Sequence, residues 1–465
     1  MTTASKAASS RLPDVVGAEH VSSDPAELSA YAVDGKLPAV VVRPSSTEEV
    51  VEIVKYAAAE KLALIASGAR TKLGIGSPPL RYDIALDMTR LDRIIKYDPG
   101  DLTLSVEAGV PLRKVAEALA EHRQFLPLAV PYFDRATVGG TIASGVDTPL
   151  RQFYGTARDY VLGMEFVVGE GVQSKSGGNV VKNVTGYDLH KLMIGALGTL
   201  GVITRVNFKT FPMPVSSRGF VATFENLDRA IDMRNRVAQS PLTPMTFDLL
   251  SPGAADLFGG PAAERLTKSP MPPNVLSPSR WTLTIGYSGK EAVLARYEAE
   301  LRRMAAESAA DNVTVLGDRV LASAFAHKRE FIPIALESSP ATTIVKIGVL
   351  PARMKDALTA AIKAAHSNQL PWIAMARSLG VIFFALLPAE RNQASHRQVV
   401  AATNQIFAAG ANLGANTTIP WCPSEWKSAL KIWGPERSDL AEMQKVKKVF
   451  DPLGIFSPGR FIGGI

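Results

Sequence analysis

Short apolar runs and amphipathic stretches alternate along the first part of the chain. Residues 39–43 (AVVVR) form an apolar run that predicts a buried strand. Ser46 with Glu49 makes a capping-box signature in front of a helical stripe of valine, isoleucine and alanine. The next apolar run, 62–66 (LALIA), predicts a second strand, and a loop rich in Gly, Ser and Thr follows at 67–76. This order indicates a β-α-β unit that ends in a glycine-rich loop.

Strands and helices are also predicted in the rest of the chain. Further strands are expected at 84–87, 94–97 and 102–107, a helix at 111–122 and a hairpin at 161–178. In the middle of the chain a strand–helix–strand pattern occurs three times, at 218–252, 281–316 and 342–387. Repeated units of this kind favour an α+β cap that has an antiparallel sheet with helices on one face.

Glycine is concentrated in one segment, because half of the 36 glycines lie between Gly68 and Gly201. Glycine lets the backbone approach a ligand closely. The loop at 67–76 can turn successive N–H groups inward as an anion nest, and Arg70 and Lys72 add positive charge beside it. A diphosphate would suit such a loop. The alternative interpretation is a plain surface loop in a turn-rich domain.

The single cysteine, Cys422, rules out an intramolecular disulfide and every zinc site built from cysteine pairs. We therefore expect a reducing, cytoplasmic compartment. There is no uncharged apolar run of about 18 residues, and the N-terminus has no apolar h-region. Neither a transmembrane helix nor a secretory signal is expected.

The formal net charge of +7 raises the question of nucleic-acid binding. The densest basic cluster, 445–448 (KVKK), lies in a helix-like stretch, and we interpret it as a solvated helix face. No basic tail or recognised nucleic-acid motif accompanies it, so no nucleic-acid partner is expected. The sequence also lacks G-x-G-x-x-G after a strand, a P-loop, H-E-x-x-H and G-x-S-x-G, which argues against the enzyme classes that depend on those motifs.

Four motifs stand in order along the glycine-dense segment: SGART (67–71), TVGGTIASG (137–145), VKNVTGYDL (181–189) and GTLGVITRV (198–206). The series resembles the FAD-binding domain shared by the vanillyl-alcohol oxidase and p-cresol methylhydroxylase families. Within that superfamily, the stretch KNVTGYDLHKLMIGALGTLGVI resembles the FAD-binding subunits of bacterial glycolate oxidases. The segment VFDPLGIFSPGRF (449–461) resembles the family's closing segment.

The resemblance implies an α+β fold with a two-part FAD-binding domain of the p-cresol methylhydroxylase type and an α+β cap with an antiparallel sheet. The FAD-binding domain is expected over 1–215, with a boundary between its two subdomains near residue 98. The cap is expected over 216–417, and 418–465 is expected to return to the FAD-binding domain.

The resemblance also implies a set of cofactor contacts. We expect FAD to be bound by Ser67, Gly68, Ala69, Arg70, Thr71, Lys72, Thr137, Val138, Gly139, Gly140, Ala143, Ser144, Gly145, Gly198, Gly201, Val202, Ile203 and Arg460. Attachment of FAD in this superfamily commonly uses a histidine in the first loop, and SGARTKLG has none, so non-covalent FAD is expected. Candidate catalytic residues at the flavin edge are Lys182, Tyr187 and Lys191; a strand lysine, a packed tyrosine and a surface lysine are the alternatives.

The function that the resemblance implies is oxidation of glycolate or a similar 2-hydroxy acid to the 2-oxo acid. The implied partners are a second flavoprotein subunit and an iron–sulfur subunit that receives the electrons. A Cys-ligated cluster cannot be held by a chain with one cysteine. Any contact with the inner membrane would be made through these partners.

One departure from the family keeps two alternatives open. Catalytic 2-hydroxy acid dehydrogenases of this superfamily typically carry H-x-G-D-G-N in the cap, where this chain has 376–382 (ARSLGVI). No family-type metal site is therefore expected. The alternatives are a non-catalytic flavin relay or scaffolding subunit of the same complex, and a stand-alone FAD-linked oxidase of another alcohol.

Overall fold

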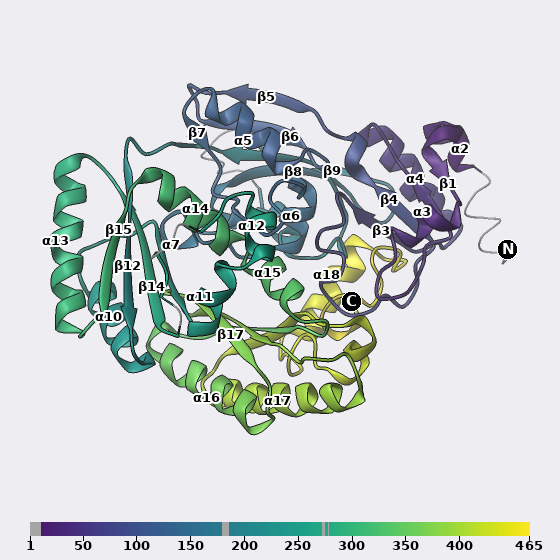
Figure 1. Cartoon of the computed structure of the whole chain (residues 1–465). Coiled ribbons are helices and arrows are strands. Elements are labelled where there is room, and N and C mark those ends of the chain that lie inside the picture. The colour runs from purple at the N-terminus through teal and green to yellow at the C-terminus, as the bar shows by residue number, and fades with distance from the viewer. Residues whose placement is uncertain (1–10, 179–185, 272–274, 278) are drawn as a thin grey trace. The chain divides into compact units, whose positions relative to one another are not determined.

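The computed structural model describes residues 11–178, 186–271, 275–277 and 279–465, and its chain divides into two compact units (Figure 1). Unit 1 is formed by residues up to 147 together with 156–212 and 435–465. Unit 2 is formed by 148–155 and 213–434.

The first sheet of unit 1 is the predicted β-α-β unit with additions. Its four strands run in the order β1 (Val21–Ser22), β2 (Val40–Val42), β4 (Ile84–Asp87) and β3 (Leu64–Ser67). The last three are parallel, and α4 (Thr47–Ala59) connects β2 to β3. Ser46 caps α4 by accepting the N–H of Glu49 at 3.2 Å. The Glu49 carboxylate reaches back one residue further than a capping box requires, to the N–H of Ser45 at 2.6 Å.

The second sheet of unit 1 is antiparallel. Its strands run in the order β5 (Ile94–Asp98), β6 (Thr103–Glu107), β10 (Val202–Lys209), β8 (Val161–Val167) and β9 (Gln173–Gly177). The helices beside it are α5 (Leu112–Ala120), α6 (Val138–Ser144), α8 (Ala157–Tyr160) and α9 (His190–Met193). Because β5 already belongs to this sheet, the change between subdomains falls just before Ile94, a few residues earlier than expected.

Short elements complete unit 1. They are α2 (Leu12–Val16), η1 (Ala18–His20), α3 (Pro25–Ser29), η2 (Met88–Arg90), the small pair β7 (Gln124–Phe125) and β11 (Phe211–Pro212), and, near the C-terminus, α18 (Leu440–Phe450) and η5 (Ile462–Gly464). After α18 the chain runs beside β3, where Leu64 N–H donates to Ile455 O at 2.8 Å and Ser457 N–H donates to Leu64 O at 2.9 Å. The C-terminal segment thus flanks the strand that leads into the first glycine-rich loop.

Unit 2 contains one antiparallel sheet of eight strands. Their order is β15 (Asn312–Leu316), β12 (Ser217–Phe224), β14 (Trp281–Ser288), β13 (Thr246–Leu250), β17 (Trp372–Arg377), β18 (Val381–Leu386), β16 (Thr343–Gly348) and β19 (Asn416–Trp421). The three predicted repeats supply seven of these strands in sequence, each repeat with its helix between strands. The antiparallel cap expected from the periodicity is therefore present.

Helices lie on both faces of this sheet, not on one as the pattern suggested (Figure 1). One face is covered by α10 (Leu227–Gln239), α13 (Glu291–Glu307), α16 (Met354–Ser367) and α17 (Gln393–Asn412). The other face carries α11 (Pro252–Phe258), α12 (Pro261–Thr267), α14 (Asp318–Arg329) and α15 (Phe331–Ser338). Phe220 and Val221 of β12 face opposite ways and are both buried, so apolar residues run on without alternation.

The boundaries of unit 2 differ from the expected 216–417 at both ends. β19 pairs with β16, so residues 418–434 continue the cap sheet before the chain returns to unit 1. Residues 148–155, which include α7 (Arg151–Tyr154), also belong to unit 2, where the Tyr154 hydroxyl lies 3.9 Å from Met245 Sδ. The remaining short elements of this unit are η3 (Pro351–Arg353) and η4 (Ser424–Ala429).

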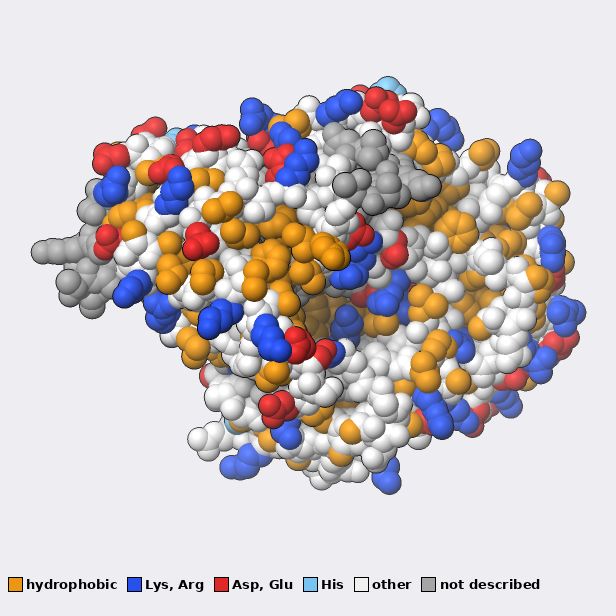
Figure 2. Space-filling view, turned by 180° about the vertical axis from the view of Figure 1, so that it is seen from behind, with side chains coloured by type: hydrophobic (Ala, Val, Ile, Leu, Met, Phe, Trp, Pro, Cys, Tyr) orange, Lys and Arg blue, Asp and Glu red, His pale blue; other side chains and the backbone are white. Residues whose placement is uncertain are grey.

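Charged side chains of both signs are interspersed over the molecular face drawn in Figure 2, with hydrophobic patches between them. In the basic cluster of α18, Lys445 is exposed and pairs with Glu442 at 2.7 Å, as a solvated helix face would. Lys447 of the same cluster instead turns inward. Among the residues that the structure describes, none of the helices combines the length and hydropathy needed to span a bilayer.

Candidate functional site

A pocket in unit 1 lies where the two sheets' loops meet. It comprises about 800 Å³ of space, counted out to its open mouth. The pocket is lined by the end of β3 with its following loop, by α6, by the loop before β10, and by the C-terminal segment. Its lining residues are Ile65, Ala66, Ser67, Gly68, Ala69, Arg70, Thr71, Lys72, Leu73, Met88, Ala108, Thr137, Gly139, Gly140, Ala143, Ser144, Leu197, Gly198, Gly201, Ile203 and Arg460.

Glycines make the pocket wall from backbone. A Cβ on Gly68 would collide with the Thr137 side chain, and a Cβ on Gly139 would lie 2.7 Å from the Ala108 Cβ. The loop after β3 and α6 therefore pack as closely as glycine alone allows. Gly198 has a φ of +68°, a left-handed conformation that L side chains rarely adopt.

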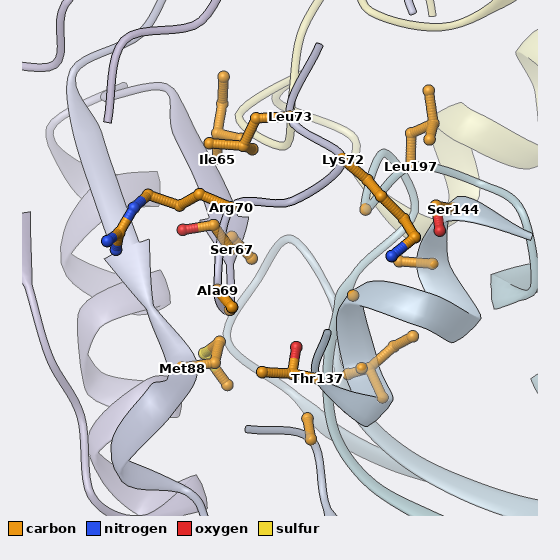
Figure 3. A pocket seen from close by; sticks show the side chains of 18 of the residues that line it. Ile65, Ser67, Ala69, Arg70, Lys72, Leu73, Met88, Thr137, Ser144 and Leu197 are labelled. Atoms are coloured by element: carbon orange, nitrogen blue, oxygen red, sulfur yellow. The ribbon is translucent and has the colours of Figure 1, made fainter. Parts of the chain in front are cut away.

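Arg70 lines the pocket through its backbone, whereas its side chain extends away from the pocket (Figure 3). Its φ is +60°, and its guanidinium carbon lies 4.3 Å from the centre of the Tyr31 ring. Its Nη1 lies 3.6 Å from Asp87 Oδ2, the same oxygen to which the Tyr31 hydroxyl donates. Burial, and then the hydrogen bond to Asp87, raises the pKa of Tyr31 far above its usual range. The Arg70 guanidinium thus lies beside Tyr31 and Asp87, and its expected contact with a diphosphate stays a prediction.

Lys72, Thr137 and Ser144 form the polar part of the pocket. Lys72 is buried and extends toward the helix that carries Ser144 (Figure 3), and its Nζ lies 3.2 Å from both Thr71 Oγ1 and Pro131 O. The Thr137 hydroxyl points into the pocket (Figure 3). Within the described part of the chain, the buried Ser67 hydroxyl has no hydrogen-bond partner.

Arg460 is buried, and it joins the C-terminal segment to the first loop. Its Nη2 donates to Leu73 O at 2.6 Å and also to Ile75 O. Its own carbonyl accepts the N–H of Ser77 at 3.0 Å. Burial lowers the pKa of the Arg460 guanidinium. The residue expected at the ring edge thus also holds the loop that lines the pocket.

Most of the residues predicted to contact FAD line this one pocket, and three do not. Val138 and Val202 are buried in the cores beside α6 and β10, where their side chains face away from the pocket. Gly145 ends α6 with a φ of +57° and packs on Gly195. Sequence reasoning missed Ile65, Ala66, Leu73, Met88, Ala108 and Leu197. These are ordinary apolar residues, which no motif separates from core residues.

Two of the three candidate catalytic residues are described by the structure, and neither lines the pocket. Lys182 lies outside the described residues. Tyr187 is 90% exposed, and Lys191 pairs with Asp188 at 2.7 Å on the surface. Lys191 lines a different pocket, formed by α9, the loop 194–200 and α18. Lys191 fits the alternative of a surface lysine, whereas Tyr187 is exposed and therefore fits neither a packed tyrosine nor a residue of the cofactor pocket.

The pocket suits FAD on its own chemistry. A flavin dinucleotide needs an apolar slot for its ring and N–H donors with positive charge for its diphosphate. Ile65, Met88 and Leu197 supply apolar wall, and Lys72 supplies positive charge beside a glycine-rich backbone. The Thr137 hydroxyl adds a polar group that a bound molecule can satisfy (Figure 3).

Two family models match consecutive parts of the chain. Residues 38–188 match the FAD binding domain, and residues 213–411 with 432–461 match the C-terminal domain of FAD linked oxidases. Together they span most of both units, and the first contains the loops at 67–73 and 137–145.

Curated relatives give the same picture. The chain is 24% identical to the glycolate oxidase subunit GlcD of Bacillus subtilis, over 97% of this chain and 95% of that protein. It is 37% identical to the glycolate oxidase subunit GlcE of Escherichia coli, over 37% of this chain and 49% of that protein. It is 34% identical to a D-lactate dehydrogenase of Anaerostipes hadrus, over 47% of this chain and 46% of that protein. The chain thus spans nearly all of the first relative but about half of the other two.

Solved structures share the whole fold. Substrate-bound p-cresol methylhydroxylase matches with a TM-score of 0.78 and 18% identity, over 99% of this chain and 97% of that one. A 4-ethylphenol oxidase from Gulosibacter chungangensis matches with a TM-score of 0.75 and 17% identity, over the same shares. These likenesses confirm the expected fold class. The chain has the fold of p-cresol methylhydroxylase, and the match of both domains shows that it belongs to the FAD-linked oxidases and is an FAD-dependent oxidoreductase.

Proposed function

We propose that this chain is the FAD-binding subunit of a complex that oxidises glycolate, or a closely related 2-hydroxy acid, to the 2-oxo acid. The observation that carries the proposal is the similarity to a glycolate oxidase subunit over nearly the full length of both proteins. The higher identity to a second glycolate oxidase subunit, over a shorter region, supports the same substrate class. The partners proposed with it are a second flavoprotein subunit and an iron–sulfur subunit.

In the proposed reaction glycolate loses two electrons and two protons and becomes glyoxylate. Bound FAD supplies an acceptor for the two electrons. The chain's own residues bind and orient: Lys72 offers positive charge to the diphosphate, and the Thr137 hydroxyl offers a hydrogen bond inside the pocket. The iron–sulfur partner receives the electrons in this scheme, because the one cysteine cannot ligate a cluster.

The proposal includes dissociable FAD. The loop that lines the pocket from Gly68 to Leu73 contains no histidine, which is the usual point of attachment in this superfamily. Acid precipitation of the flavin-loaded chain should leave the yellow cofactor in the supernatant. Flavin that stays with the protein pellet would contradict this part of the proposal.

A second candidate function is a non-catalytic flavin relay or scaffolding subunit of the same complex. The hairpin between β17 and β18 favours it, since residues 376–382 carry no histidine or carboxylate. In the structure two buried arginines hold this hairpin in place. Arg377 pairs with Asp248 at 2.7 Å, and Arg234 donates to Ser378 O. A stand-alone oxidase of another alcohol is the remaining alternative.

The test is an anaerobic absorbance spectrum of the purified chain, loaded with FAD, before and after glycolate and then D-lactate are added. Bleaching by either acid means that the chain oxidises a hydroxy acid unaided. L-lactate serves as the stereochemical control. An unchanged flavin spectrum in the isolated chain, with bleaching when the co-expressed complex is used, would select the relay function. No bleaching in either sample would contradict the substrate class.

A further inference from the structure

The segment from Asp451 to Arg460, here called the C-terminal strap, contacts two of the loops that line the pocket. Residues 455–457 extend the first sheet beside β3, and Arg460 holds the carbonyls of Leu73 and Ile75. Ser457 lies next to Gly198, because a Cβ added to that glycine would come 3.7 Å from Ser457 Oγ. The strap therefore reaches both the loop after β3 and the loop before β10.

Lys447 fastens the strap to the second of these loops. Its Nζ donates to Thr199 O at 2.7 Å, to Asp451 Oδ2 at 2.6 Å and to Phe456 O at 3.0 Å. An ammonium group has three hydrogens, so the bonding capacity of Lys447 is fully used. One of the three acceptors lies on the loop between Gly198 and Gly201, and the other two lie on the strap.

Asp451 completes the arrangement from within the strap. Its side chain is fully buried and accepts the N–H of Ile455 at 3.0 Å and of Phe456 at 2.9 Å, as well as the Lys447 ammonium. Gly169 packs against it, since a Cβ there would lie 2.7 Å from Asp451 Oδ1. Hydrogen bonds to a charged group are the strong ones, and in a buried setting a lost partner is costly.

We propose that Lys447 is a positioning residue of the FAD pocket, which fixes the Gly198 loop against the C-terminal strap so that the pocket is shaped before the cofactor arrives. The proposal rests on the assignment of FAD to this pocket. It does not make Lys447 a contact of the cofactor, because Lys447 is absent from the pocket lining among the described residues.

Lys447 differs in its surroundings from the exposed Lys445 of α18. Lys445, two residues earlier on the same helix, pairs with Glu442 in solvent, where both side chains are more than two thirds exposed. Lys447 is largely buried, and burial lowers its pKa while Asp451 opposes that shift. Carrying a desolvated ammonium is expensive, and here it joins two segments that are far apart in the chain.

The test compares Lys447→Met with the matched control Lys445→Met, which removes the same charge from the exposed side of the helix. FAD binding to the apoprotein is followed by flavin fluorescence, and apoprotein stability is measured separately by thermal unfolding. We expect the dissociation constant of FAD to rise about tenfold or more in Lys447→Met and to stay at the wild-type value in Lys445→Met.

A folded Lys447→Met protein that binds FAD as tightly as wild type would overturn the inference. Wild-type protein that binds no FAD would instead overturn the assignment of the pocket, so the two failures can be told apart. If Lys447→Met does not fold, Lys447→Arg decides. It keeps the charge, but its planar fork cannot place donors on the same three acceptors. A several-fold weaker affinity then supports positioning, and wild-type affinity overturns it.

Discussion

Unit 1 and unit 2 bury backbone and side chains in different ways. In unit 1 the pocket wall includes Arg70, Leu197 and Gly198, all with positive φ, and glycines that another backbone approaches closely. In unit 2 the sheet presents regular apolar side chains to long amphipathic helices. A wall that faces a ligand through its backbone admits few residues at each place, whereas a packed core admits many. This explains why recognisable motifs cluster in unit 1.

The two units also differ in what their buried charges do. In unit 2 Asp248 lies between Lys328 at 2.9 Å and Arg377 at 2.7 Å, on the sheet face covered by α14. Burial alone would raise the pKa of Asp248, but the two cations outweigh it and hold the pKa below its usual range. The three charged side chains of Asp248, Lys328 and Arg377 thus join β13, α14 and β17 within the core of unit 2. In unit 1, by contrast, Lys447 joins the loop that contains Thr199 to the C-terminal strap beside the pocket.

Asp248→Asn should have the largest effect. We expect it to lower the free energy of unfolding and to leave FAD affinity unchanged. The change leaves Lys328 and Arg377 buried around a neutral amide, and breaking a buried pair typically costs about 3–5 kcal/mol. The free energy of unfolding from denaturant titration measures this loss. Glu300→Gln, which removes the carboxylate that pairs with the exposed Arg296, should change little. A large loss of FAD affinity in folded Asp248→Asn would break the division of roles between the units.

Gly139→Ala should have the next largest effect and should appear in cofactor binding. The new Cβ would lie 2.7 Å from the Ala108 Cβ, so α6 must move away from its place in the pocket wall. Overpacking of this kind costs about 1–3 kcal/mol, and we expect FAD affinity to fall by about tenfold or more. Gly74→Ala, in the first loop, is the control, because its Cβ meets nothing within 4 Å. Equal affinities of the two variants would count against the close-packed wall.

Each unit contains one buried histidine, and acid should act on both. Burial lowers the pKa of His190 in unit 1 and of His327 in unit 2 below the usual 6.5. Because the pKa in the folded state is lowered, the contribution of each neutral histidine to the free energy of unfolding is complete above about pH 6.5. It is lost as the pH falls from that value through the lower pKa of the folded state. The slope can reach about 1.4 kcal/mol per pH unit for each histidine.

A pH series of denaturant unfolding compares a substitution of the buried His327 with a substitution of the exposed His122. His327→Gln should flatten the pH dependence of the unfolding free energy below pH 6.5, because one titrating group is removed. His122→Gln, on the surface, is the control for replacing an imidazole by an amide. A wild-type slope in His327→Gln would mean that His327 does not contribute to acid sensitivity.

The smallest expected effect comes from removing one hydroxyl in each unit. Thr137→Val keeps the side-chain shape and deletes a hydroxyl that points into the pocket, so FAD affinity should fall by about threefold to tenfold. Thr223→Val deletes a buried hydroxyl in the sheet of unit 2 that has no partner among the described residues. It should leave FAD affinity unchanged and raise the melting temperature slightly, since an unsatisfied polar group is lost. Unchanged FAD affinity in Thr137→Val together with weaker affinity in Thr223→Val would contradict the different roles of the two units.

Much of this molecule could be predicted from its sequence, for two different reasons. The three strand–helix–strand repeats of the cap follow from periodicity, and the strands appear where they were expected. The loops at 67–73 and 137–145 follow from glycine and hydroxyl patterns, and they do meet at one pocket. Their contacts with FAD stay predictions until binding is measured.

What could not be predicted depends on the direction of single side chains. Arg70 looked like a charge for the diphosphate, but its left-handed backbone turns the guanidinium toward Tyr31 and Asp87. Lys447 looked like a surface lysine, but it lies two residues after the exposed Lys445, about 200° around the helix, and points at Thr199. Neither direction is encoded in residue type, because both depend on partners far away in the sequence.

The strap beside β3 also has a consequence for biosynthesis. Leu64 leaves the ribosome early, whereas Ile455 and Ser457, which accept and donate its backbone hydrogen bonds, are made after all of unit 2. During that interval this edge of β3 has no neighbour, which is the state in which strands pair with the wrong chain. The time needed to synthesise unit 2 therefore sets the minimum time for which this edge of β3 is exposed.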